Sequence, residues 1–268
     1  SATPGDTWMD YMPVFIANGF YKNKTEFCTR HVVYDPYSKF PKIKRYLDTG
    51  HLEKLRRKIV VTMSVEKTAL MHHQWVKVGY DEELYERSVK NRWDFENGQP
   101  IKNSSEYVNV MRRITNSDKR RLQALWNLFG THSRIIVFYN FNYELEMLRN
   151  FCDSNEIPYS EYNGHRHQEI PDMKSWIYLV HYASGSEAWN CITTDTILFY
   201  SMNYSYRSMI QGSGRIDRVN TPYSDLYCYH LFSDSDIDKA IKSCLTKKKD
   251  FNESVYLRKI GLQEKQSL

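Results

Sequence analysis

The chain beyond Gly130 alternates between short, almost entirely apolar runs and longer segments with helical spacing, and this alternation limits the fold more than any other feature. The apolar runs are typical of strands buried on both faces, and they lie at 134–139, 159–162, 176–181, 196–201 and 226–232. Helical spacing is found at 142–155, 206–217 and 236–247. Strands that alternate with helices predict an α/β fold, in which helices cover both faces of one parallel sheet.

The chain before Gly130 has a different pattern. Residues up to about Lys58 are rich in aromatic and basic side chains, and they contain helical patches at 7–16 and 50–57. Short strands are predicted at 59–63 and 74–80, and helical spacing follows from Asp81 to Gly130. We therefore predict three segments, which are 1–63, a linking strand and helical segment at 64–130, and the α/β domain at 131–268.

Composition narrows the possible partners. The net charge is +5, from 37 basic and 32 acidic residues, which permits a nucleic-acid partner without demanding one.

The 5 cysteines are widely spaced without a CxxC pair, which indicates reduced thiols and a cytoplasmic protein, with neither disulfide framework nor zinc site. No apolar run reaches about 18 residues, so no membrane span is predicted. His165, His167 and Glu169 have chelating spacing without a nearby fourth ligand, so we predict an exposed loop and no metal.

The segment QGSGRIDR, from Gln211 to Arg218, has a spacing that suits binding of a polyanion. If it is helical, Gln211, Arg215 and Arg218 lie on one face, and two guanidinium groups with an amide suit a triphosphate. The alternative is a surface helix with two solvated arginines. A polar turn at 183–190 favours the first interpretation, because it follows the strand predicted at 176–181. Turns at the carboxyl ends of parallel strands are where α/β proteins bind ligands.

These elements together resemble a known family. QxxGRxxR, preceded by the GxxxxN turn that starts at Gly185, resembles motifs VI and V of superfamily 2 helicases. The strand at 134–139 with Asn140 resembles motif IV, and the opening Ser-Ala-Thr-Pro resembles motif III. The motif order and the GRIDR string are most similar to the Swi/Snf-like branch, and within it to the DEAD/DEAH-type helicases of bacteriophages and prophages. The resemblance covers nearly the whole chain.

The resemblance implies a RecA-like C-terminal helicase lobe at 131–268, with 64–130 leading into it and a remnant of the first lobe at 1–63. It also implies roles for individual residues. Arg215 and Arg218 would be the catalytic arginine fingers that reach the γ-phosphate. The nucleotide would be contacted by Gln211, Gly214, Gly185, Glu187 and Asn190, and the nucleic acid by Asn140, Asn163, Gly164 and Ser184. Ser1 and Thr3 would couple the two sites.

A complete motor also needs a phosphate-binding loop GxxxxGK[ST], and this chain contains no Gly-Lys dipeptide. Asp81-Glu82 is interpreted as a helix start and not as a Mg²⁺-binding motif. We therefore expect ATP and Mg²⁺ to be held mainly by a separate N-terminal lobe, and this chain alone to be inactive.

Three hypotheses remain open at this point. The first is the C-terminal half of an ATP-dependent DNA helicase or translocase that contacts the DNA backbone. The second is a stand-alone nucleic-acid-binding or regulatory module without ATPase activity. The third is an RNA helicase of the same superfamily. The start inside motif III without a Met favours the first, and the Swi/Snf-like spacing favours duplex DNA.

Overall fold

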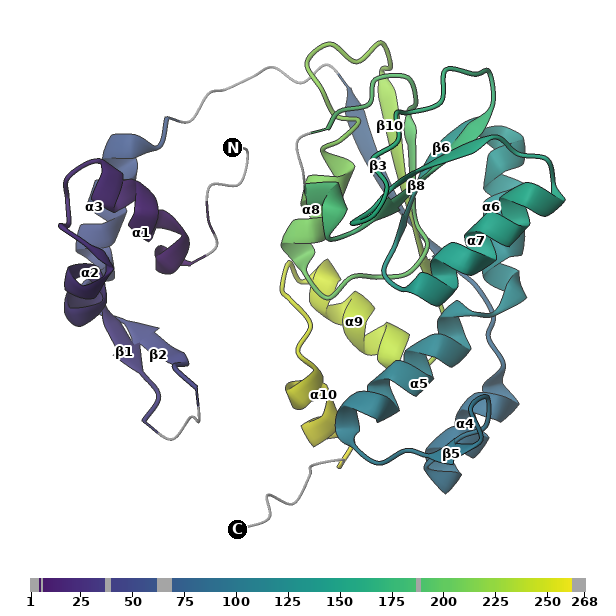
Figure 1. Ribbon diagram of the computed structural model, residues 1–268, viewed down its shortest axis with the longest axis horizontal. Helices are drawn as coiled ribbons and strands as arrows, with labels where there is room; N and C mark the ends of the chain where they lie inside the picture. The colour runs from purple at the N-terminus through teal and green to yellow at the C-terminus, as the bar shows by residue number, and fades with distance from the viewer. Residues whose placement is uncertain (1–4, 6, 37–39, 62–68, 187–188, 262–268) are drawn as a thin grey trace. The chain divides into compact units, whose positions relative to one another are not determined.

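The computed structural model describes residues 5, 7–36, 40–61, 69–186 and 189–261 (Figure 1). The chain divides into two compact units, residues 1–65 and 66–268. Three of the expected site residues, Ser1, Thr3 and Glu187, lie outside the described residues.

The smaller unit has a core of its own, built mainly from aromatic side chains such as Phe15 and Phe27, both fully buried. Its elements are α1 (Trp8–Ala17), α2 (Lys24–His31), the antiparallel pair β1 (Val32–Tyr34) and β2 (Ile43–Tyr46), and α3 (Thr49–Ile59). The strand predicted at 59–63 is wrong for its described part. Ile59 instead ends α3, because it extends the apolar face that Leu52 and Leu55 bury in this core.

The larger unit is built on one six-stranded sheet in the order β3-β10-β9-β6-β8-β7, and every pairing in it is parallel. The strands are β3 (Leu70–Lys77), β6 (Arg134–Tyr139), β7 (Tyr159–Tyr162), β8 (Trp176–His181), β9 (Thr196–Phe199) and β10 (Asp225–Phe232). The α/β prediction is confirmed. β3 starts earlier than the predicted strand at 74–80, because its whole length pairs with β10 from Leu70↔Asp225 onwards.

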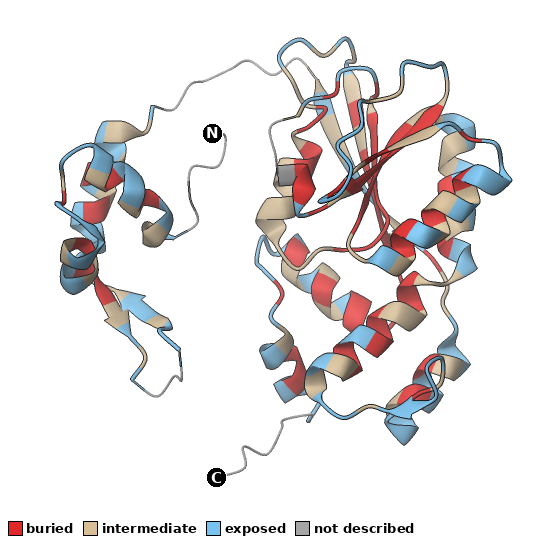
Figure 2. Ribbon diagram, in the orientation of Figure 1, coloured by how far each residue is buried: buried red, intermediate tan, exposed pale blue. Residues whose placement is uncertain are grey.

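Helices cover both faces of this sheet (Figure 1). One face packs against α6 (Lys119–Thr131) and α7 (Asn142–Ser154). The other packs against α5 (Ser104–Asn116), α8 (Tyr206–Ser213) and α9 (Asp236–Thr246). The remaining elements are α4 (Glu82–Asn91), the short pair β4 (Trp93–Asp94) and β5 (Gln99–Pro100), the 3₁₀ turn η1 (Ser184–Ser186) and α10 (Glu253–Lys259). The central strands are almost wholly buried, as Figure 2 shows.

One helix is shorter than predicted, and this changes the candidate site. α8 ends at Ser213, whereas helical spacing predicted a helix over 206–217. Gly214 caps the helix, and the chain then folds into turns that bury Arg215. Gln211, Arg215 and Arg218 therefore do not share one helical face, and this part of the prediction is wrong.

No helix among the described residues combines the length and apolarity needed to cross a membrane.

Candidate functional site

An open groove of about 490 Å³ lies at the carboxyl ends of β6, β7 and β8. Its walls are the first turns of α7, the turn 163–166 after β7, and Ala183 with Ser184 after β8. Parallel strands bring these connections to one sheet edge, where α/β proteins bind ligands. Of the four expected nucleic-acid residues, Asn163, Gly164 and Ser184 line the groove, and Asn140 does not.

A buried carboxylate supports one side of this groove. Glu161 of β7 has no exposed surface, and its two oxygens accept hydrogen bonds from Arg149 at 2.7 and 2.6 Å and one from Arg166 at 3.2 Å. Burial alone would raise the pKa of the Glu161 carboxyl, but the hydrogen bonds and charges of the two arginines outweigh it and lower that pKa. The carboxylate is therefore ionised at neutral pH, and it orients both guanidinium groups at the groove.

Asn163 shapes the turn that follows β7. Its Oδ1 accepts the backbone N–H groups of His165 and Arg166 at 2.9 and 3.0 Å, and its Nδ2 donates to Glu161 at 3.0 Å. The side chain is buried and fully used inside the protein. The turn therefore presents Gly164 and its neighbours to the groove, and Asn163 holds it in place.

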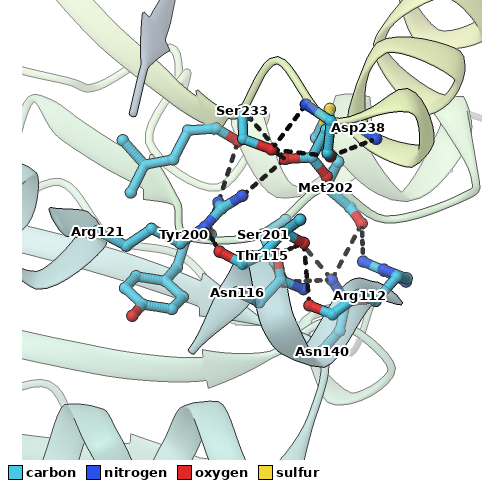
Figure 3. A network of polar contacts seen from close by, with 12 residues as sticks. Arg112, Thr115, Asn116, Arg121, Asn140, Tyr200, Ser201, Met202, Ser233 and Asp238 are labelled. Atoms are coloured by element: carbon cyan, nitrogen blue, oxygen red, sulfur yellow. Dashed lines mark hydrogen bonds and ion pairs between the residues drawn. The ribbon is translucent and has the colours of Figure 1, made fainter. Parts of the chain in front are cut away.

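Asn140 directly follows β6, and its side chain links this segment to the one that follows β9. Its Nδ2 donates to Ser201 Oγ at 2.8 Å (Figure 3). Its Oδ1 accepts from Asn203 at 2.8 Å. Ser201 also donates to Glu144 at 2.9 Å. Glu144 is fully buried, and burial raises the pKa of its carboxyl against the opposing charge of Arg112. The structure thus gives Asn140 an internal structural role between β6 and β9.

The same polar network contains a fully buried ion pair that sequence reasoning missed. Arg121 Nη2 donates to Asp238 Oδ2 at 2.7 Å, and the other guanidinium nitrogens donate to the carbonyls of Thr115 and Tyr200 at 2.9 and 2.7 Å (Figure 3). The pair ties α6 to α9 and to the end of β9. In the sequence, Arg121 is one of several clustered basic residues, and the neighbouring sequence does not distinguish it from the exposed Arg120.

Two glycines of the candidate motifs pack against one aromatic ring. A methyl group built on Gly185 would lie 2.5 Å from the Phe138 ring, and one on Gly212 would lie 3.2 Å from the same ring. Phe138 of β6 therefore holds η1 and α8 close together. No residue with a side chain fits at Gly185 without a shift of this ring or of the turn.

Gly185→Ala is expected to lower the free energy of unfolding by about 1–3 kcal/mol, because overpacking forces neighbouring groups out of their preferred positions. Gly164→Ala is the matched control in the other groove turn, since a methyl group there meets nothing within 4 Å. Urea unfolding of both variants measures the difference. Equal stability of the two would contradict the close packing around Phe138.

Arg215 points into the protein. Its Nε donates to the carbonyl of Gly185 at 2.9 Å, and its Nη1 to the carbonyl of Trp189 at 3.1 Å. The guanidinium also lies over the Trp189 ring, 5.6 Å from the centroid. Burial, and then the charge of nearby Arg218, lower the pKa of Arg215. Two cations therefore lie near each other, an arrangement that an anion would stabilise.

The other expected nucleotide residues lie around this pair. Arg218 is half-buried, and its Nε is buried without a hydrogen-bond partner among the described residues. Gln211 is half-buried on the last turn of α8, and Gly214 is the cap of that helix. Asn190 is exposed. Gly185 of the motif V turn and the segment after α8 are thus brought together by the hydrogen bond from Arg215, although not through the single helical face that the spacing predicted. No group of three His, Cys, Asp or Glu able to hold a metal occurs within the described part of the chain.

Comparisons with known proteins show similarity in sequence and in structure. No protein-family model matches the chain. In sequence it is 22% identical over 184 residues to the "Chromodomain-helicase-DNA-binding protein 3 homolog" of Caenorhabditis elegans, and the match covers 65% of this chain and 10% of that protein. The chain thus spans about a tenth of the length of this relative. In structure it is similar to the crystal structure of the C-terminal part of the Fun30 ATPase domain, with a TM-score of 0.59 and 10% identity. That match covers 70% of this chain and 94% of the other.

These similarities say nothing of bacteriophage helicases, and the closer resemblance to them stays a prediction. The similarity in structure agrees with the parallel sheet. The chain has the fold of the C-terminal part of the Fun30 ATPase domain, and in sequence it is similar to a part of a helicase homologue.

Proposed function

We propose that this chain is the C-terminal half of an ATP-dependent DNA helicase or translocase, and that it supplies arginine-finger chemistry and part of the nucleic-acid groove. One observation carries the proposal: Ser184 lines the groove, and the adjacent Gly185 carbonyl is hydrogen-bonded to Arg215 of the QxxGRxxR segment. A single turn thus touches both candidate binding regions. Through this turn, a change at the arginine segment would reach the groove.

The partners follow from this proposal. ATP with Mg²⁺ would bind between the arginine segment and an N-terminal lobe that carries the phosphate-binding loop, of which residues 1–63 would be the remnant. Residues 64–130 would lead into the second lobe. The name of the Caenorhabditis elegans relative includes both helicase and DNA binding, and this supports DNA as the nucleic acid that the groove binds. Without a phosphate-binding loop of its own, the chain alone would not hydrolyse ATP.

The chain is expected to bind mixed-sequence duplex DNA weakly, with little sequence preference. Arg149 and Arg166 are the two arginines of the groove, but Arg149 is already held as a fork by Glu161, so about one phosphate contact, from Arg166, is expected. Counterion release then gives a slope of about −0.9 for log K against log salt, or roughly a threefold loss of affinity between 50 and 200 mM salt. Fluorescence anisotropy across a salt series measures this slope.

Arg166→Ala should make the slope less steep by up to about 0.9, whereas Arg120→Ala, an exposed arginine paired with Asp118 outside the groove, should leave it unchanged. Salt-independent binding, or a strong preference for one DNA sequence, would count against the proposal. Tighter binding to RNA of the same length would favour an RNA helicase instead.

A further inference from the structure

We infer that Arg215 is a positioning residue, a clasp that fixes Gly185 and Trp189 beside the groove, and that Arg218 alone is the phosphate-binding finger. This inference rests on the proposed function and divides between the two arginines a role that the family resemblance gives to both. The reason is their different surroundings, since the guanidinium of Arg215 donates two hydrogen bonds inside the protein, whereas Nε of Arg218 has no hydrogen-bond partner among the described residues.

Arg215 contacts Gly185, Trp189 and Cys191. The side chain donates to the carbonyls of Gly185 and Trp189, and the backbone carbonyl of Arg215 accepts the N–H of Cys191 at 3.0 Å. Trp189 in turn lies against the rings of Tyr162 and Tyr178, with centroids 6.0 and 5.6 Å away. The clasp therefore connects the end of α8 to the aromatic cluster beneath the turn.

The chemistry of the guanidinium supports a clasp over a finger. Arginine binds phosphate best as a planar fork with two parallel N–H groups. In Arg215 both Nε and Nη1 already donate to carbonyls, and the guanidinium carbon lies over the Trp189 ring. The edge of the guanidinium that includes Nε is therefore already used inside the protein, and only the outer edge of Nη1 and Nη2 is left for a phosphate in this largely buried site. A phosphate that took the Nε edge would break a charge-assisted hydrogen bond and leave a carbonyl without its donor.

Arg218 lies three residues further on, and within the described part of the chain its guanidinium shows none of these contacts. The residue is more exposed than Arg215, and its buried Nε has no hydrogen-bond partner there. Arg215 would thus hold Ser184 in the groove wall through its bond to the adjacent Gly185 carbonyl, and Arg218 would bind the phosphate. Together they link the two binding regions through one short segment.

The test is hydrogen exchange on the 268-residue chain, with Arg215→Ala, Arg215→Lys and Arg218→Ala compared with the parent. The Cys191 amide, which is held by the Arg215 carbonyl, is expected to exchange about tenfold faster in Arg215→Ala. The Tyr182 amide is held by Tyr139 and should not change in any variant. Arg218→Ala should leave both amides as in the parent. Unchanged exchange at Cys191 in Arg215→Ala would overturn the clasp.

Arg215→Lys keeps the charge, but a lysine cannot donate to both carbonyls as a fork, so this variant should also speed exchange of the Cys191 amide. It replaces the alanine variant if that variant does not fold.

DNA binding distinguishes a positioning role of Arg215 from a direct contact with DNA. Arg215→Ala should weaken binding with an unchanged salt slope, whereas a slope smaller by about 0.9 would make Arg215 a phosphate contact and overturn the inference. If the parent chain binds no DNA, the proposed function fails, and the exchange of Cys191 still decides the clasp.

Discussion

Arg121→Met is expected to lower the free energy of unfolding by about 3–5 kcal/mol, because it leaves the buried Asp238 carboxylate without its cation. Asp238 is 2% exposed, and the Ser233 N–H and hydroxyl at 2.7 and 2.8 Å would be its remaining partners around that oxygen. The change also removes the donors to the carbonyls of Thr115 and Tyr200. Urea unfolding followed by circular dichroism measures the loss.

The adjacent arginine is the matched control. Arg120 pairs with Asp118 at the surface with 56% of its side chain exposed, and Arg120→Met should change stability by no more than about 1 kcal/mol. A second variant tests the cause. Arg121→Met combined with Asp238→Leu removes both charges and should recover part of the loss. If Arg121→Met costs no more than Arg120→Met, the buried pair does not stabilise the larger unit.

The contrast between these two arginines shows where sequence reasoning stops. Strands such as 134–139 and 176–181 were predicted with the bounds that the structure has, because burial on both faces leaves a continuous apolar run in the sequence. The burial of Arg121 produces no such pattern in the neighbouring sequence. Its partner Asp238 is 117 residues further along the chain, and only the packing of α6 and α9 brings them together.

The end of α8 is a second example. Spacing alone continues this helix to 217, since Arg215 and Arg218 fit a helical face as polar residues. The structure instead ends it at Ser213, and burial of the Arg215 guanidinium against Gly185 and Trp189 accompanies the turn. The elements of the site could be predicted from local pattern and motif order. The division of roles between the two arginines depends on tertiary contacts.

Arg218→Ala is expected to reduce the DNA-saturated ATPase rate of the complete two-lobe enzyme by about 10³–10⁵-fold, the range that arginine fingers contribute to phosphoryl transfer. An arginine at the γ-phosphate stabilises charge that develops in the transition state, so its loss falls on kcat. The DNA concentration at half-saturation should stay near that of the parent, because the groove residues are untouched.

Arg215→Ala is the informative comparison, since it lies three residues away and has the same charge. A clasp variant should shift half-saturation to higher DNA concentration, because the wall at Ser184 is no longer held. ATPase rate against DNA concentration for both variants separates the roles in one experiment. A normal plateau for Arg218→Ala, reached only at higher DNA concentration, would make Arg218 a DNA contact and remove the finger assignment. A collapsed plateau at unchanged half-saturation would place its guanidinium at the transferring phosphate, where charge builds as the bond to the leaving oxygen breaks.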